Sequence, residues 1–168
     1  MDIDIKMSGK LIFDPKNMTK KHNKQSSWKK TAMIMLNDDT SHYYRYLIEK
    51  RFPLIQGVNG DTNWINVPLR KSHVTIINDK VNDGIWNKLK SKWNYTSVDF
   101  FYNWGGLRNN GEHLYFKVDS PMAQSIRDDG NLGDPYYGFH LTIGHVPEDS
   151  LVKSSHLKEV RNYMLNLK

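Results

Sequence analysis

Residues 138–144 read Gly-Phe-His-Leu-Thr-Ile-Gly, and residues 72–77 read Ser-His-Val-Thr-Ile-Ile. Both stretches contain a histidine, an apolar residue, a threonine and an isoleucine in that order. Side chains two residues apart on a β-strand project from the same face. Each stretch therefore predicts a strand with an apolar face directed into a core and with an imidazole and a hydroxyl on the opposite face.

The four polar residues of the two stretches form two matched pairs. His73 and Thr75 share one face of the first strand, and His140 and Thr142 share one face of the second strand. A single histidine in an apolar strand is more often a hydrogen-bonded packing residue, because histidine is intermediate in burial. Two matching elements favour function over packing. We therefore expect the two strands to present these residues to a single cleft.

The surrounding sequence alternates strand and helix patterns. Strands are predicted over 8–13, 31–36, 72–77, 96–104, 113–118 and the second motif, and helices over 42–52, 83–92, 121–129 and 154–167. Residues 105–106 and 109–111, which are rich in Gly and Asn, are expected to form the turn of a hairpin. The resulting order, ββαβαββαβα, suggests two related lobes.

The length and composition are those of a globular protein rather than a disordered one. A chain of 168 residues fits one domain, 1–168, with a mobile loop expected over 16–30. No apolar run approaches the ~20 residues of a membrane span, and no secretory signal is seen, so a soluble cytoplasmic protein is expected. The chain has no cysteine, which excludes disulfides and thiolate metal sites. The net charge of +6 favours an anionic partner such as a nucleotide or RNA, but a solvated basic surface explains it equally well.

Two histidines in one cleft can supply both a base and an acid, because an imidazole has an ordinary pKa of about 6.5. Phosphodiester cleavage needs this pair: one group deprotonates the attacking hydroxyl or water, and the other protonates the leaving oxygen. Thr75 and Thr142 can donate hydrogen bonds to the phosphate. Lys71 or Arg70, just before the first strand, can add positive charge. No Asp/Glu cluster accompanies either motif, so we expect no metal and no cofactor.

Aromatic residues near the motifs could stack a nucleobase. Stacking of a base on an aromatic ring tolerates any base sequence. The candidates for base stacking are Trp64, Trp104, Tyr136, Tyr137 and Phe139. Tyr137 and Trp64 are preferred, because turns beside a catalytic strand line clefts more often than strand interiors do.

The segments 73–76 and 140–143 resemble the paired His-x-Thr/Ser-x signature of the 2H phosphoesterases, also called LigT-like. The resemblance covers two tetrapeptides and the element order between Leu11 and Pro147. It implies a bilobal α+β fold, in which two pseudo-symmetric lobes with antiparallel sheets flank a central cleft and the helices lie outside. It also implies that His73 and His140 are a metal-independent acid–base pair, and that the two threonines bind phosphate. Which histidine is the base is left open.

The resemblance implies a substrate with RNA-type chemistry: a cyclic oligonucleotide, a 2′,3′-cyclic phosphate or a 2′,5′-linked oligoadenylate. The context of residues 136–144 is similar to that of phage-encoded members, which include an anti-CBASS nuclease that degrades the cyclic nucleotide signals of bacterial immunity. Such a member would act in the host cytoplasm. The alternatives are a protein that sequesters nucleotide or RNA in the same cleft without cleaving it, and a basic structural RNA-binding domain.

Overall fold

The structure, a computed structural model, describes residues 4–16, 18, 28–37, 39–51, 71–110 and 113–145. These residues form strands and helices in the order β1 (Asp4–Phe13), β2 (Ala32–Met35), α1 (Asp39–Arg51), β3 (His73–Ile77), α2 (Asp83–Trp93), β4 (Ser97–Asn109), β5 (His113–Asp119), α3 (Pro121–Asp129) and β6 (His140–His145). The order is the predicted one as far as the second motif. The helix predicted over 154–167 and most of the loop predicted over 16–30 lie outside the described residues.

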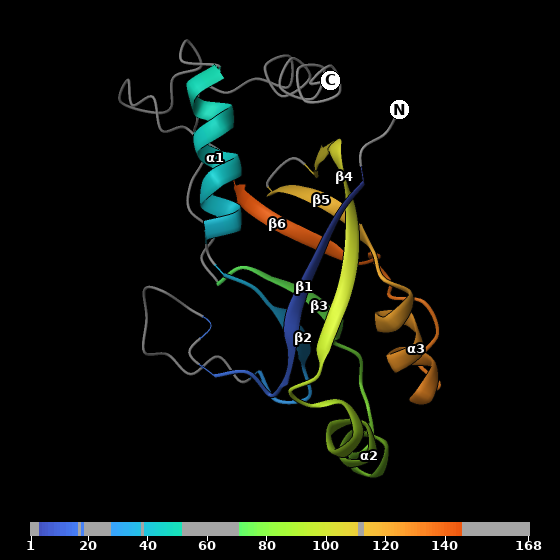
Figure 1. The fold of residues 1–168 in the computed structure, drawn as a ribbon. Coiled ribbons are helices and arrows are strands. Elements are labelled where there is room, and N and C mark those ends of the chain that lie inside the picture. Colours follow the sequence, from blue (N-terminus) through green and yellow to red (C-terminus); the bar gives the residue numbers. More distant parts are fainter. Residues whose placement is uncertain are drawn as a thin grey trace.

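The strands close into one antiparallel barrel in the order β1-β2-β3-β6-β5-β4 (Figure 1). The fold is therefore α+β with an antiparallel sheet, as predicted, but the described strands form a single barrel rather than two separate sheets. The element order nevertheless repeats. The segments β1-β2-α1-β3 and β4-β5-α3-β6 have the same ββαβ order, and α2 joins them.

The hydrophobic core lies inside the barrel and follows from the alternation of side chains along each strand. One row of cross-strand partners runs around the barrel, and every member of it is at most 1% exposed: Leu11, Ile34, Val74, Leu141, Phe116 and Leu107. Directly paired residues project from the same face of a sheet. The residues before and after each member of this row therefore point out of the barrel.

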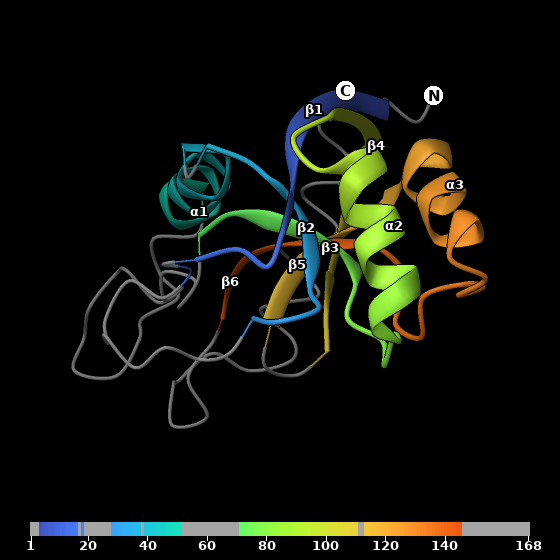
Figure 2. The same ribbon diagram turned by 90° about the horizontal axis from the view of Figure 1, so that it is seen from below.

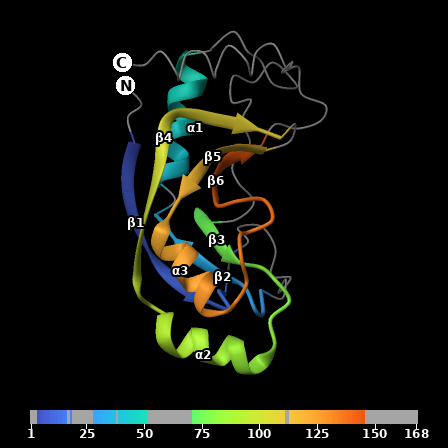
Figure 3. The ribbon, with the colours of Figure 1, turned by 90° about the vertical axis from the view of Figure 1, so that its right-hand side faces the viewer.

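The helices lie on two sides of the barrel. In Figure 2, α1 lies on one side of the strands, and α2 and α3 lie together on the other. The pair β1 and β4 forms one wall, at the left of Figure 3, and β3 and β6 lie to its right. Tyr44 of α1 packs its ring against Tyr102 of β4 and Phe116 of β5. Two of the helices contact a strand of the other half: α1 contacts β6, and α3 contacts β3 as well as β4.

The helix boundaries follow their capping residues. Ser120 accepts a hydrogen bond from the Ala123 amide at 3.1 Å, and α3 begins at Pro121 as predicted. Asn82 caps α2 in the same way, through the Ile85 amide at 2.9 Å. None of the helices in the described ranges is long and apolar enough to cross a membrane.

The predicted hairpin turn differs from the structure. Strand β4 continues through residues 105–106 to Asn109, and its register with β5 shifts between Tyr102 and Leu107. The two glycines therefore lie in an irregular stretch of the strand rather than in a turn, because a strand accommodates a bulge where glycine removes the side-chain constraint. Gly9 has a different role in β1. A Cβ atom there would lie 2.5 Å from the Met35 carbonyl oxygen, so only glycine allows β1 to approach β2 this closely.

Candidate active site

The two His-x-Thr motifs lie on neighbouring strands. Val74 of β3 is paired with Leu141 of β6 in antiparallel register, and both side chains are buried in the barrel. Continuing this antiparallel register by one residue in each direction sets His73 against Thr142, and Thr75 against His140. All four side chains are half-buried. This pairing brings together two segments that are far apart in the sequence.

The two histidines occupy diagonal positions on the outer face of the sheet. Diagonal neighbours on paired strands are roughly 7–8 Å apart between Cα atoms. Since each imidazole projects away from the core, one phosphate group can lie between the two rings. Each ring also has the threonine of the other strand beside it, so the motifs are related by an approximate twofold axis through the Val74–Leu141 pair.

The same hydrogen bond orients both imidazoles. Nδ1 of His73 lies 2.6 Å from the carbonyl oxygen of Lys71, and Nδ1 of His140 lies 3.2 Å from that of Gly138. In each case the partner is two residues earlier in the chain. A carbonyl oxygen can only accept, so Nδ1 is the donor and carries the ring proton. The basic lone pair of each neutral ring is therefore on Nε2.

The backbone before each motif positions the carbonyl group that accepts from the histidine. Gly138 has a φ of +68°, a conformation that glycine adopts without strain. Lys71 is held from the other side, because its amide donates to the Met18 carbonyl at 3.0 Å. Backbone geometry thus fixes the two carbonyl groups that accept from the histidines.

The threonine hydroxyls are available to a ligand. Within the described parts of the chain, neither Thr75 nor Thr142 makes a side-chain hydrogen bond. A hydroxyl can donate to a non-bridging phosphate oxygen. The arrangement therefore offers two imidazoles and two hydroxyl donors around one position.

The neighbouring strands add two residues that the sequence analysis missed. On β5, Lys117 is opposite His140, and Tyr115 is opposite Thr142. The Tyr115 ring meets the His140 ring edge-on, with centroids 5.7 Å apart and planes at 69°. Alternation in the segment 113–118 was the signal available: its apolar residues at 114, 116 and 118 leave Tyr115 and Lys117 on the face away from the core.

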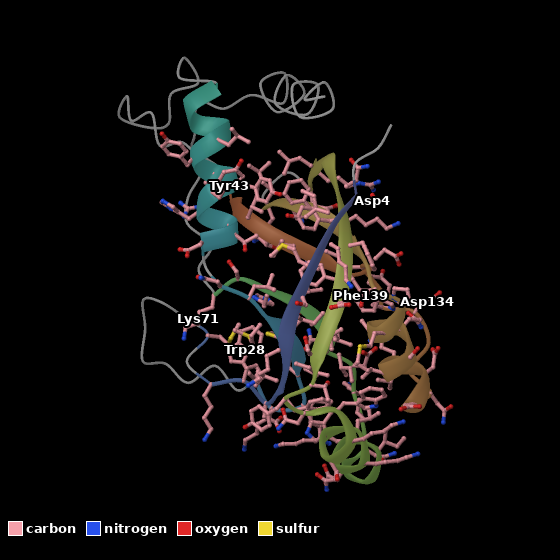
Figure 4. The ribbon with its side chains drawn as sticks, viewed as in Figure 1. Asp4, Trp28, Tyr43, Lys71, Asp134 and Phe139 are labelled. Atoms are coloured by element: carbon pink, nitrogen blue, oxygen red, sulfur yellow. The ribbon has the colours of Figure 1, made fainter. Side chains whose placement is uncertain are left out.

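The predicted substrate-binding residues have different outcomes. Lys71 is exposed and lies below α1 in Figure 4, across the barrel from Asp134 beside α3. Tyr136 and Tyr137 are 91% and 84% exposed in the turn before β6, and their rings meet edge-on at 4.7 Å. Trp64 lies outside the described residues.

The prediction for Phe139 is wrong. Its side chain is only 7% exposed and belongs to the hydrophobic core. The physical reason is strand parity: Phe139 precedes His140 directly, so it projects to the same side as Leu141. A residue on that side cannot stack a base bound near the imidazoles.

A buried arginine of α3 connects the two motif strands. Arg127 is 1% exposed, and its guanidinium donates to the Ile76 carbonyl of β3 at 2.8 Å and to the Gly133 carbonyl at 2.7 Å. It also forms a two-pronged ion pair with Asp79, at 2.7 and 3.2 Å. This hydrogen bonding holds the pKa of Asp79 below its usual range, although partial burial opposes the shift. Arg127 thereby ties the end of β3 to the turn that leads into β6.

No group of three or more His, Asp or Glu side chains that could hold a metal occurs among the described residues. A comparison with models of known protein families gave no match, and searches of curated proteins and of solved structures gave no significant one. Two imidazoles whose Nδ1 atoms donate to the backbone, together with two hydroxyls, suit proton transfer on both sides of a bound tetrahedral anion.

Proposed function

We propose that this protein is a phosphodiesterase that cleaves a nucleotide phosphodiester by general acid–base catalysis, with His73 and His140 as the two proton-transfer groups. The observation that carries the proposal is the matched Nδ1–carbonyl hydrogen bond of the two histidines on paired strands. A packing role does not require two such histidines to repeat the same orientation around one axis.

The proposed reaction moves one proton at each end of the phosphate. The neutral imidazole accepts a proton from the attacking oxygen at Nε2, while the protonated one gives its Nε2 proton to the leaving oxygen. Thr75 and Thr142 donate to the non-bridging oxygens, whose charge grows in the transition state. For a 3′,5′ linkage the nucleophile is the ribose 2′-hydroxyl, and for a 2′,3′-cyclic phosphate it is water. Because the two histidines occupy equivalent positions, the direction in which the substrate binds decides which is the base.

The substrate classes proposed are a cyclic oligonucleotide signal and RNA-type 2′,3′-cyclic or 2′,5′-linked phosphates. We further propose that the two ββαβ segments correspond to the two lobes of a 2H phosphoesterase-like fold. The repeated element order and the position of one His-x-Thr motif at the last strand of each segment support this correspondence.

The test is a panel of cyclic di- and trinucleotides, linear 2′,5′-oligoadenylate and RNA with a 2′,3′-cyclic end, incubated with excess chelator and analysed by mass spectrometry. We expect cleavage of at least one compound, and a roughly 10²- to 10⁴-fold loss of kcat/KM in His73→Ala and in His140→Ala. The losses should not multiply in the double variant, because the two groups act in one step.

The matched control is His42→Ala, since His42 is exposed on α1 and outside both motifs. A 2′-deoxy analogue of a cleaved 3′,5′ substrate should resist cleavage if the 2′-hydroxyl attacks. Nucleotide binding by the wild type with no turnover of any compound would instead favour a sequestering protein. Full activity in the double histidine variant would end the catalytic proposal.

A further inference from the structure

We propose that Lys117 binds a second phosphate of the substrate, so that the preferred substrate carries at least two phosphates, as a cyclic or linear oligonucleotide does and a 2′,3′-cyclic mononucleotide does not. This inference rests on the proposed function and concerns the same site. The approximate twofold axis makes the positions of Met35 and Lys117 equivalent, but the two side chains differ in charge.

The strands that flank the motifs carry different residues at equivalent places. On β2, Met35 is opposite His73, and on β5, Lys117 is opposite His140. Met35 is half-buried, whereas Lys117 is exposed. The histidine and threonine pairs are arranged alike at the two ends of a bound phosphodiester. The residues beside them differ: Met35 presents a thioether next to His73, and Lys117 presents an ammonium next to His140.

The position of Lys117 places it outside the reacting centre. A phosphate held between the two imidazoles lies over the line between β3 and β6. Lys117 is on β5, about one and a half strand spacings from that line, or roughly 7 Å. His140 lies between them. Successive phosphates of a nucleotide chain are separated by one sugar, which is a spacing of the same order. The ammonium is therefore placed for the neighbouring phosphate.

The charges around Lys117 leave it able to bind an anion. In the described part of the chain its ammonium makes no ion pair or hydrogen bond. Arg108 of β4 is opposite Tyr115 and is also exposed, so a second cation lies on the same side. Asp119 lies two residues further along β5 and pairs with Phe101, beyond this group.

Among the described residues, the other side of the site has no cation at the place equivalent to that of Lys117. Lys10 of β1 is opposite Met35, but its ammonium lies over the ring of Tyr95, 5.9 Å from the centroid. Lys71 precedes β3 and so lies at the other end of the motif pair from Lys117. A substrate with a second phosphate therefore gains most when that phosphate lies over β5, next to His140.

The experiment compares two ligands that share their nucleosides and differ in phosphate number: cyclic di-AMP, with two phosphates, and the dinucleoside monophosphate ApA, with one. The guanosine pair, cyclic di-GMP and GpG, is run in parallel. Binding constants are measured in the His73→Ala/His140→Ala background, where turnover cannot interfere, and kcat/KM is measured in the background with both histidines.

We expect Lys117→Gln to weaken binding of the cyclic dinucleotide roughly 10- to 100-fold, and to change ApA binding by less than about threefold, since a charge-assisted hydrogen bond is lost only with the former. Lys117→Arg should keep most of the affinity. Lys88→Gln, which removes an exposed lysine of α2, is the matched control and should change neither. Thermal melts show that each variant is folded.

Each other outcome overturns the inference. An equal loss for both ligands means that Lys117 contacts the reacting phosphate, and no loss means that it contacts neither. A wild-type protein without preference for two phosphates, with either base, also contradicts it. The readouts separate this inference from the proposed function: a selective loss of binding without turnover leaves the subsite standing and rejects catalysis, whereas turnover with unselective loss does the reverse.

Discussion

Val74 lies directly opposite Leu141, and this single pairing between β3 and β6 sets the positions of all four motif residues. Both side chains are fully buried, so a slip of the register by one residue would move them out of the core and the histidines into it. The apolar face of the two strands thus fixes the geometry of the polar face. Changes on the apolar face should therefore lower stability, whereas changes on the polar face of the same strand should lower activity.

Leu141→Ala and Thr142→Val test that separation. Leu141→Ala should lower the free energy of unfolding by about 2.7–5 kcal/mol, because it leaves a cavity inside the barrel. Thr142→Val should change it by less than about 0.5 kcal/mol, since the hydroxyl makes no hydrogen bond within the described residues. If Thr142 binds phosphate, the same variant should lose roughly 10- to 100-fold in kcat/KM. Urea unfolding and steady-state kinetics measure the two effects, and equal destabilisation by both variants would contradict the assignment of faces.

The ion pair of Arg127 with Asp79 predicts a pH-dependent part of the stability. Because hydrogen bonds from Arg127 hold the pKa of Asp79 below its usual 3.8 in the folded protein, the carboxylate is better stabilised there than in the unfolded chain. Its contribution is complete above that value and is lost as the pH falls through the lower, folded pKa. Asp79→Asn should therefore cost about 1–3 kcal/mol at pH 7 by leaving buried donors of Arg127 poorly paired.

The measurement for Asp79 is the difference in free energy of unfolding between wild type and Asp79→Asn from pH 7 to pH 2.5. The other carboxylates are common to both proteins, so the difference isolates this group. It should stay constant to about pH 4 and shrink below it. A difference that stays constant down to pH 2.5 would show that the ion pair does not lower the pKa of Asp79 in solution.

Tyr44 and Tyr102 form a hydroxyl pair inside the barrel, with the oxygens 2.6 Å apart. Burial is the main cause that raises the pKa of both phenols, so both stay protonated across the working pH range. Either single change to Phe leaves the remaining hydroxyl without this partner and should cost about 1–3 kcal/mol. The double variant should cost less than the sum, with a coupling energy of about 0.5–3 kcal/mol in a double-mutant cycle of urea unfolding. Strict additivity would argue against the hydrogen bond.

Tyr136 and Tyr137 should affect binding but not stability. Both rings are exposed, so replacing either by Ala should change the free energy of unfolding by less than about 0.5 kcal/mol. If either ring stacks a base, its loss should weaken nucleotide binding by about 1–3 kcal/mol. The control is Tyr95→Asn: Tyr95 is 65% exposed in a separate turn, and its φ of +67° suits Asn. Isothermal titration with a nucleotide that the panel identifies as a substrate measures the affinity. Unchanged affinity in both variants would show that these tyrosines do not contact the nucleotide.

The sequence predicted the elements well where the deciding signals were local. The capping residues Ser120 and Asn82 and the alternation in the motif strands depend only on near neighbours, so α3, α2 and β3 were found within a residue. The barrel was not predicted, because the pairing of β1 with β4 and of β3 with β6 joins segments distant in the chain. The role of Arg127 was not predicted for the same reason, since its partners Ile76 and Asp79 are 51 and 48 residues away in the sequence.

Two errors at the site could have been avoided from parity alone. Phe139 has the same parity as Leu141 and belongs to the core, so its distance from the motif was a poor guide to exposure. Lys117 and Tyr115 alternate with Leu114, Phe116 and Val118, which are buried. What parity does not supply is that β5 lies next to β6, and this neighbour relation is what brings Lys117 to His140.

The crossed packing of the helices has a consequence for how the molecule is made. Since α1 of the first ββαβ segment rests on β6, and α3 of the second rests on β3 as well as on β4, β3 lacks its covering helix when the first segment stands alone. A nascent chain that has emerged only through β3 lacks both the strand that α1 covers and the helix that covers β3. The first segment should therefore not fold stably by itself, and the two imidazoles should meet only after synthesis has passed β6.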